Sequence, residues 1–150
     1  SRKDIDAERV AILGWSHGGS TVLQAMARPA PRPPGFNAAV ALYPGCTAHA
    51  KAPERFHPYA PLIVLIGEAD DWTPASPCRE LAAIVKQRPE PMELVLYPGA
   101  YHDFDNPALK KARLRTEVPN GVNPGKGVTV APDPVAREDA KKRVIEFLRR

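Results

Sequence analysis

The sequence predicts an α/β fold in which helices pack against a parallel sheet. Short apolar runs alternate along the chain with segments of helical periodicity, and this order is typical of β-α-β units joined by right-handed crossovers. Each apolar run is followed at once by a glycine or by a tyrosine-proline-glycine turn. Because parallel α/β sheets bind their ligands beside the carboxyl ends of the strands, we expect the functional residues to follow these runs.

Four apolar runs predict the strands. Val10–Leu13 is short, carries two β-branched residues and ends at Gly14, a pattern that favours a strand buried on both faces. The other runs cover residues 38–42, 61–66 and 92–96. Together they predict a sheet of about four parallel strands.

Two helices are predicted between these strands. The first follows Gly18 and Gly19 and covers residues 20–27, because prolines at 29, 31, 33 and 34 prevent its continuation. The second runs through Leu81 to Val85 and takes either Thr73 or Ser76 as its cap, since a proline follows each of them.

The last part of the chain predicts a loop and then a helix. Residues 105–132 carry glycine, proline, asparagine and charges without periodicity, which indicates a long surface excursion. Asp133 caps the final helix and Pro134 takes its first position. Its apolar face is formed by Ala136, Ala140, Val144, Phe147 and Leu148.

Composition is that of a globular domain, with 150 residues, 43% of them hydrophobic, and a net charge of +4. The basic residues lack a nucleic-acid reading motif and indicate a solvated face. No apolar run is long enough to span a membrane, so we expect a soluble protein of the cytoplasm or periplasm, without membrane or nucleic-acid partners. Cys46 and Cys78 have no metal or redox spacing; they are either two thiols or a disulfide pair.

The strongest motif is Gly14-Trp15-Ser16-His17-Gly18, which matches G-x-S-x-G between a predicted strand and a predicted helix. Such a turn is so sharp that flanking glycines are needed to let strand and helix approach each other. Ser16 would then stand at the amino end of the helix, where the backbone N–H of His17 faces a developing oxyanion. The same pattern also occurs as a plain glycine-serine turn.

Two further loops supply a carboxylate and an imidazole. Gly67 to Pro74 contains the adjacent pair Asp70 and Asp71, either of which is also a common turn former or helix cap; we favour Asp70 as the buried carboxylate that orients an imidazole. His102 follows the fourth predicted strand. The order serine, aspartate, histidine is that of one class of serine hydrolases, and each residue follows its own parallel strand.

Four segments together resemble the dienelactone hydrolase family, a branch of the α/β-hydrolases. They are Gly-Trp-Ser-His-Gly-Gly at 14–19, Tyr-Pro-Gly-Cys at 43–46, Gly-Glu-Ala-Asp-Asp-Trp-Thr-Pro at 67–74 and Tyr-His-Asp-Phe at 101–104. The resemblance spans most of the chain and implies that Ser16, Asp70 and His102 form a catalytic triad. Founding members of the family use cysteine as the nucleophile, so Ser16 indicates the serine-bearing relatives.

The resemblance also implies that the chain is incomplete as a fold. The family has several strands before the nucleophile strand, together with the loop that donates the second oxyanion N–H, and this sequence begins shortly before Val10. We therefore expect residues 1–150 to be the carboxyl-terminal portion of a single α/β-hydrolase domain whose partner is its missing amino-terminal half. Alone, the first strand would expose its edge, and the fragment is expected to be inactive.

The implied activity is cleavage of a small-molecule carboxylic ester or lactone through an acyl-enzyme, with no cofactor and no metal. His102, Asp103 and Asp105 lack the further partners that a metal site needs. The alternatives are a non-catalytic α/β-hydrolase-like binding module, or a peptidase or acyltransferase with the same triad.

Several residues near the motifs have open roles. Trp15 is expected to pack, whereas Trp72 and Tyr101 either pack or contact substrate. The side chain of His17 contacts substrate or caps the helix. His49 and His57 lie in a predicted polar loop without a specific role.

Overall fold

The computed structural model describes residues 4–6, 8–27 and 35–150, and it contains the parallel four-stranded sheet that the sequence predicts. The strands β1 (Ala11–Trp15), β2 (Ala38–Leu42), β3 (Leu62–Gly67) and β4 (Met92–Tyr97) lie side by side in chain order. All neighbouring pairs are parallel, so their carboxyl ends meet at one edge of the sheet. All four predicted strands are confirmed within one or two residues.

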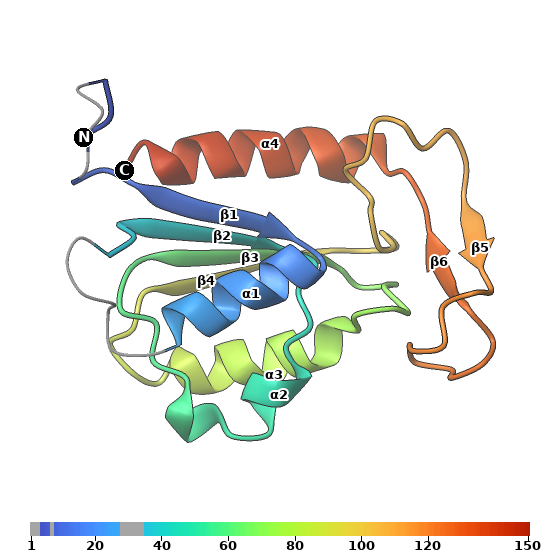
Figure 1. The fold of residues 1–150 in the computed structure, drawn as a ribbon, viewed down its shortest axis with the longest axis horizontal. Coiled ribbons are helices and arrows are strands. Elements are labelled where there is room, and N and C mark those ends of the chain that lie inside the picture. Colours follow the sequence, from blue (N-terminus) through green and yellow to red (C-terminus); the bar gives the residue numbers. More distant parts are fainter. Residues whose placement is uncertain (1–3, 7, 28–34) are drawn as a thin grey trace.

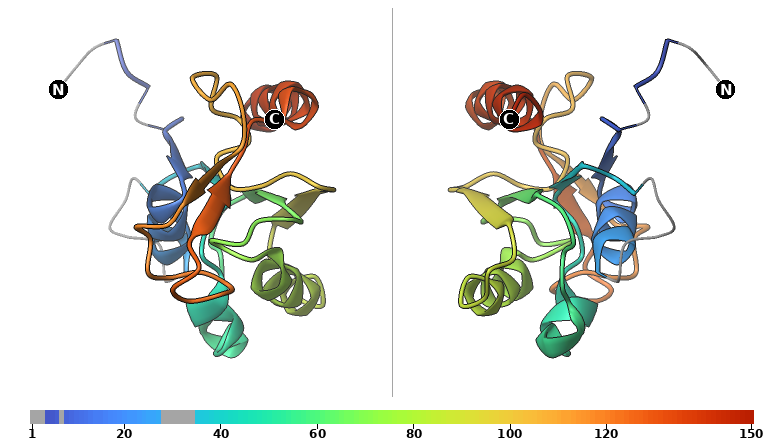
Figure 2. Two further views of the ribbon diagram at one scale, coloured as in Figure 1. Left: turned by 90° about the vertical axis from the view of Figure 1, so that its right-hand side faces the viewer. Right: turned by 90° about the vertical axis from the view of Figure 1, so that its left-hand side faces the viewer.

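Helices cover both faces of this sheet (Figure 1). Helices α1 (His17–Met26) and α3 (Ala75–Val85) lie on one face, and α4 (Pro134–Leu148) lies on the other, as the end-on views of Figure 2 show. The two central strands are the most buried, with every residue of β3 shielded from solvent. This is the pattern expected of strands covered on both sides.

The first strand departs from its prediction. Ala11 and Trp15 are exposed and Ile12 is only partly buried, so β1 is not covered on both faces. The reason is its place at the edge of the sheet, because within the described residues it pairs with β2 alone.

Helix α1 begins three residues earlier than expected, because Gly18 and Gly19 belong to it. The prolines at 29, 31, 33 and 34 lie outside the described residues. Helix α3 begins at Ala75 with Pro74 at its cap position, so both proposed caps, Thr73 and Ser76, were wrong. The hydroxyl of Thr73 is instead engaged with the loop that contains Asp70.

Helix α4 follows its prediction closely. Asp133 caps it by accepting hydrogen bonds from the backbone N–H groups of Val135 and Ala136, and Pro134 occupies the first turn. Ala136, Ala140 and Phe147 of the predicted apolar face are buried and Val144 packs on the core, but Leu148 is 43% exposed. The helix ends at Leu148, which explains why this side chain escapes the interface.

The segment 105–132 is more ordered than the sequence indicated. It contains β5 (Arg113–Arg115) and β6 (Val128–Val130), which pair as an antiparallel hairpin. Both strands are too short to show periodicity, and the hairpin is held by tertiary contacts: Val118, Val128 and Val130 are buried. The predicted polar loop after Cys46 likewise contains the short helix α2 (Thr47–Ala50) and a 3-10 turn (Pro53–Arg55).

The two cysteines form a disulfide bond. Cys46, which follows β2, is joined to Cys78 on α3, and both side chains are buried. Of the two possibilities that the sequence left open, the structure therefore contains the disulfide. No helix of the described part of the chain is long and apolar enough to cross a membrane.

Candidate active site

Ser16 occupies a strained turn between β1 and α1. Its backbone has φ of 52° and ψ of −118°, a conformation that is rare for a residue with a side chain. The turn is sharp enough that a Cβ on Gly14 would lie 2.5 Å from the carbonyl carbon of Gly18. Gly14 is therefore needed for the close approach of strand and helix, whereas a Cβ on Gly18 would meet nothing within 4 Å. The expectation that both flanking glycines are sterically required holds for Gly14 only.

The turn is also anchored to the neighbouring strand. The backbone N–H of Ser16 donates to the carbonyl of Leu42 at 2.9 Å. His17 is the first residue of α1, and its imidazole is exposed and does not cap the helix. The first N–H groups of a helix have no partner within it and carry the positive end of the helix dipole. An oxyanion beside Ser16 would meet this end of α1.

Asp70 is buried in the loop after β3, with 3% of its surface exposed. Its Oδ1 accepts the backbone N–H groups of Trp72 at 2.9 Å and Thr73 at 2.8 Å. Its Oδ2 lies 2.8 Å from Nδ1 of His102. The local turn therefore fixes one carboxylate oxygen and leaves the other to face the imidazole.

His102 lies in the loop after β4, and its side chain is buried between the rings of Tyr43 and Trp72. Its ring centroid lies 4.6 Å from that of Tyr43 and 4.6 Å from that of Trp72. A carboxylate can only accept, so the neutral tautomer that fits has its proton on Nδ1, facing Asp70. Nε2 is then the acceptor, and it lies 2.8 Å from the hydroxyl oxygen of Ser16.

The fold thus brings together the three side chains that the sequence singled out from three separate loops. Ser16, His102 and Asp70 form a continuous series of hydrogen bonds, with Asp70 instead of Asp71 at its end. A buried series of this kind can move a proton from the hydroxyl to the imidazole while the carboxylate stabilises the positive charge. Asp71 turns away and accepts the backbone N–H of Thr129 at 2.7 Å and its hydroxyl at 2.9 Å.

Thr73 is a site residue that the sequence analysis proposed only as a helix cap. Its hydroxyl oxygen lies 3.0 Å from Oδ2 of Asp70, 3.0 Å from Nδ1 of His102 and 3.0 Å from the carbonyl of Tyr43. A hydroxyl has one proton, so it donates to one acceptor at a time. No local pattern in the sequence separates this role from that of a helix cap, because the partners of the hydroxyl lie in loops that follow three different strands.

The aromatic residues near the site behave differently from one another. Trp72 is partly buried. The Arg115 guanidinium lies 5.3 Å from the centre of its ring, and the centroid of the His102 ring lies 4.6 Å from it. Tyr101 is partly buried. Trp15 is 50% exposed, and its indole N–H donates to Asp105 at 2.8 Å, so the expectation that it simply packs was wrong.

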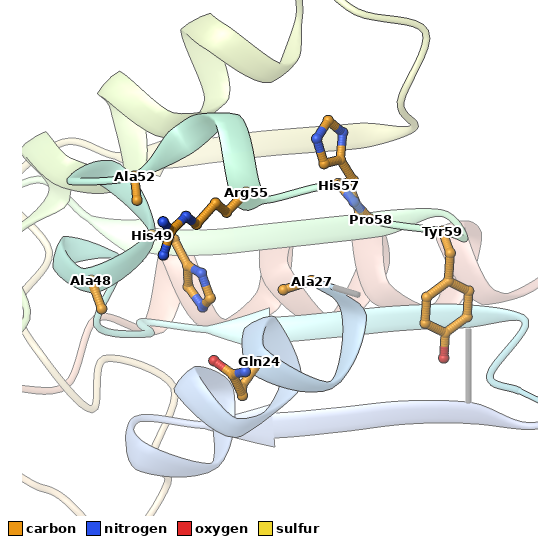
Figure 3. A pocket seen from close by; sticks show the side chains of 9 residues that line it. All are labelled: Gln24, Ala27, Ala48, His49, Ala52, Arg55, His57, Pro58 and Tyr59. Carbon is orange, nitrogen blue, oxygen red and sulfur yellow. The ribbon is translucent and has the colours of Figure 1, made fainter. Parts of the chain in front are cut away.

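An open cavity lies beside α1 and α2 (Figure 3). This cavity of about 850 Å³ is lined by residues of α1 and its C-cap Ala27, of α2 and of the segment 52–59, including His49 and His57. None of Ser16, Asp70 or His102 lines it. Partial burial lowers the pKa of His49. His57 has its Nδ1 2.7 Å from Glu90.

The sequence model of the dienelactone hydrolase family matches residues 1–150. The chain belongs to the dienelactone hydrolase family. Among solved structures, a Klebsiella pneumoniae protein assigned as a dienelactone hydrolase superposes with a TM-score of 0.73 and 19% identity, over 99% of this chain and 55% of that one. No curated protein sequence gives a significant match.

Two other structures show how widely this family member shares its fold. A carboxylesterase from Lactobacillus plantarum superposes with a TM-score of 0.68 and 14% identity, over 95% of this chain and 59% of that one. Dipeptidyl peptidase 4 from Porphyromonas gingivalis superposes with a TM-score of 0.64 and 18% identity, over 96% of this chain and 20% of that one. These likenesses show the α/β-hydrolase fold. The chain spans little more than half the length of the Klebsiella pneumoniae and Lactobacillus plantarum proteins.

Proposed function

We propose that this member of the dienelactone hydrolase family is a serine hydrolase that cleaves a carboxylic ester or lactone. The observation that carries the proposal is the series Asp70–His102–Ser16, in which both contacts to the imidazole measure 2.8 Å. Acyl transfer needs these three groups: a hydroxyl nucleophile, a base, and a carboxylate that orients the base.

In the first half of the reaction, the Ser16 oxygen bonds to the substrate carbonyl carbon as its proton moves to Nε2 of His102. Asp70 accepts from Nδ1 and stabilises the imidazolium. The tetrahedral intermediate collapses when Nε2 returns the proton to the departing alkoxide, which leaves as the alcohol. In the second half, the oxygen of a water molecule bonds to the acyl carbon as its proton moves to Nε2. The bond between the acyl carbon and the Ser16 oxygen then breaks, Nε2 returns the proton to that oxygen, and the carboxylic acid leaves.

The negative oxygen of each tetrahedral intermediate is assigned to the amino end of α1. The backbone N–H of His17 supplies one donor, and the helix dipole adds to it. We assign Trp72 and Tyr101 as candidate substrate contacts, because both lie beside His102 in the fold or the chain and are only partly buried.

We also propose that the chain is the carboxyl-terminal portion of a single α/β-hydrolase domain. Support comes from the relatives, because this chain superposes on 55% and 59% of two of them while it is itself covered almost completely. The further strands of such a domain would pair with the edge of β1. The experiments below therefore use the complete protein that contains this chain.

The test is covalent labelling with a fluorophosphonate together with the release of p-nitrophenol from a p-nitrophenyl ester. We expect one label per active site, located on Ser16, and a burst of p-nitrophenol; both should vanish in Ser16→Ala. Ser76→Ala is the matched control, because Ser76 is exposed on α3. Turnover that persists in Ser16→Ala would end the proposal, and a wild-type protein that takes no label would favour a binding module.

The peptidase likeness calls for one further comparison. An ester and an amide that share the same acyl group should be offered to the protein side by side. We expect turnover of the ester to exceed that of the amide, and the reverse preference would identify a peptidase that uses the same three residues.

A further inference from the structure

The carboxylate of Asp105 bridges two aromatic side chains at the carboxyl end of the sheet. Its Oδ1 accepts the phenol of Tyr43 at 2.7 Å, and its Oδ2 accepts the indole N–H of Trp15 at 2.8 Å. We name these three residues, Trp15, Tyr43 and Asp105, the Asp105 link. Both bonds are charge-assisted, and such bonds are shorter and stronger than neutral ones.

Each member of the link belongs to a different part of the site. Trp15 ends β1 and directly precedes Ser16, while Tyr43 directly follows β2. Asp105 lies three residues after His102, in the loop that leaves β4. The link therefore joins the turn that carries the hydroxyl to the loop that carries the imidazole.

The sheet topology explains why such a link is needed. In the described part of the chain, β1 and β4 are at opposite edges of the sheet. Adjacent strands lie about 4.8 Å apart, so the two loops start roughly 14 Å from each other. The His102 loop must reach across the ends of the strands to place Nε2 at Ser16. A proton transfer over 2.8 Å depends on where the far end of this loop is held.

Tyr43 contacts two other residues of the candidate site, His102 and Thr73. Its ring contacts His102 with centroids 4.6 Å apart, and its carbonyl accepts the hydroxyl of Thr73 at 3.0 Å. Its backbone is held at φ of 38°, which is unusual for an aromatic residue. Burial and the neighbouring carboxylates of Asp105 and Asp103 raise the pKa of the Tyr43 phenol far above its ordinary value, so it stays protonated and donates.

We propose that the Asp105 link is a positioning device for proton transfer, in which Asp105 fixes the His102 loop over the Ser16 turn. None of its three residues is assigned to the reacting atoms. The inference rests on the serine-hydrolase function proposed above, and it adds positioning residues that lie outside the series of Ser16, His102 and Asp70.

The test measures saturation kinetics of fluorophosphonate labelling in the complete protein. Asp105→Ala removes both bonds, and we expect its maximal labelling rate to fall at least tenfold while half-saturation stays unchanged. Asp105→Asn should retain most of the rate, since its amide oxygen can accept from Trp15 and its N–H can donate to the Tyr43 oxygen. Tyr43→Phe and Trp15→Phe each remove one bond and should give smaller losses.

The chain offers a control at Tyr97, the last residue of β4. Oδ2 of Asp139 on α4 accepts the phenol of Tyr97 at 3.0 Å and a side-chain N–H of Arg143, so a tyrosine again donates to a carboxylate, but neither bond involves the Ser16 turn. Asp139→Ala and Tyr97→Phe should label at the wild-type rate. Tyr97→Phe removes the same kind of tyrosine–carboxylate bond as Tyr43→Phe, but that bond does not join the Ser16 turn to the His102 loop.

The outcomes separate this inference from the proposed function. If Ser16 is labelled and Asp105→Ala matches the wild-type rate, the positioning role is wrong and the hydrolase function stands. If Asp105→Asn is as slow as Asp105→Ala, the charge matters instead of the bonds, and the positioning role is again wrong. If Asp105→Ala fails to fold, Tyr43→Phe and Trp15→Phe decide, and wild-type rates in both would overturn the proposal. A wild-type protein without label at Ser16 would instead contradict the proposed function.

Discussion

Asp70 and Asp71 are adjacent in the chain, yet their carboxylates bind different parts of the molecule. Asp70 lies 2.8 Å from Nδ1 of His102, whereas Asp71 holds Thr129 of β6 through two hydrogen bonds. One turn thus supplies a carboxylate to the site and a second carboxylate to the hairpin beside it.

This difference predicts opposite effects of two similar variants. Asp70→Asn should lower kcat on the order of 10⁴-fold, because an amide can hold the imidazole in the wrong tautomer and cannot stabilise its charge. Asp71→Ala should leave kcat within a few-fold but cost about 1–3 kcal/mol of unfolding free energy through its lost bonds to Thr129. Ester turnover and denaturant unfolding of both variants check the pair. Equal kcat values would show that Asp70 has no special role.

The hydroxyl of Thr73 predicts a smaller effect on the same reaction. It contacts Asp70, His102 and the carbonyl of Tyr43, and Thr73→Val removes it with little change of shape. A hydrogen bond of about 1–1.5 kcal/mol corresponds to roughly a tenfold loss of kcat. Thr73→Ser keeps the hydroxyl and should stay within about twofold of wild type. A Val variant as active as the Ser variant would assign Thr73 to packing alone.

The sequence predicted most of the sheet and the place of the site because both depend on local patterns. A β-branched apolar run such as 62–66 and the turn at Gly14 each carry their own physical requirement. The same holds for Asp133, whose cap involves only its immediate neighbours. Ser16, Asp70 and His102 come together because each follows a parallel strand, and chain order alone indicates which edge they share.

The parts that the sequence did not predict depend on contacts between distant residues. The hairpin of β5 and β6 is held by Asp71, which lies 58 residues before Thr129. The bond between Trp15 and Asp105 spans 90 residues. The hydroxyl of Thr73 contacts Asp70 in the loop after β3 and His102 in the loop after β4. Because His102 is distant in the chain, no local pattern distinguishes Thr73 from a helix cap.

The disulfide predicts a marked dependence of stability on redox conditions. Cys46 and Cys78 close a loop across 32 residues. In the chain-entropy model, a crosslink of this span lowers the entropy of the unfolded chain and so stabilises the folded state by about 3–4 kcal/mol. The double variant Cys46→Ala, Cys78→Ala should lower the unfolding free energy by about that amount. Denaturant titrations of the wild type with and without reductant provide the comparison. A reductant should have no further effect on the double variant, and a wild type that is equally stable when reduced would contradict the prediction.

Two buried tyrosines predict a loss of stability at high pH. Burial, followed by hydrogen bonds to Asp105 and Asp139 respectively, raises the pKa of Tyr43 and of Tyr97 above the ordinary value of 10.0. Above pH 10 the unfolded chain releases protons that the folded chain keeps, so the unfolding free energy falls as pH rises, by about 1.4 kcal/mol per pH unit for each tyrosine. Below that pH the contribution is fully present. Urea unfolding of wild type and Tyr43→Phe at stepped pH should show a slope that is shallower in the variant by one tyrosine's share, and parallel slopes would mean that Tyr43 ionises in the folded protein at its usual pH.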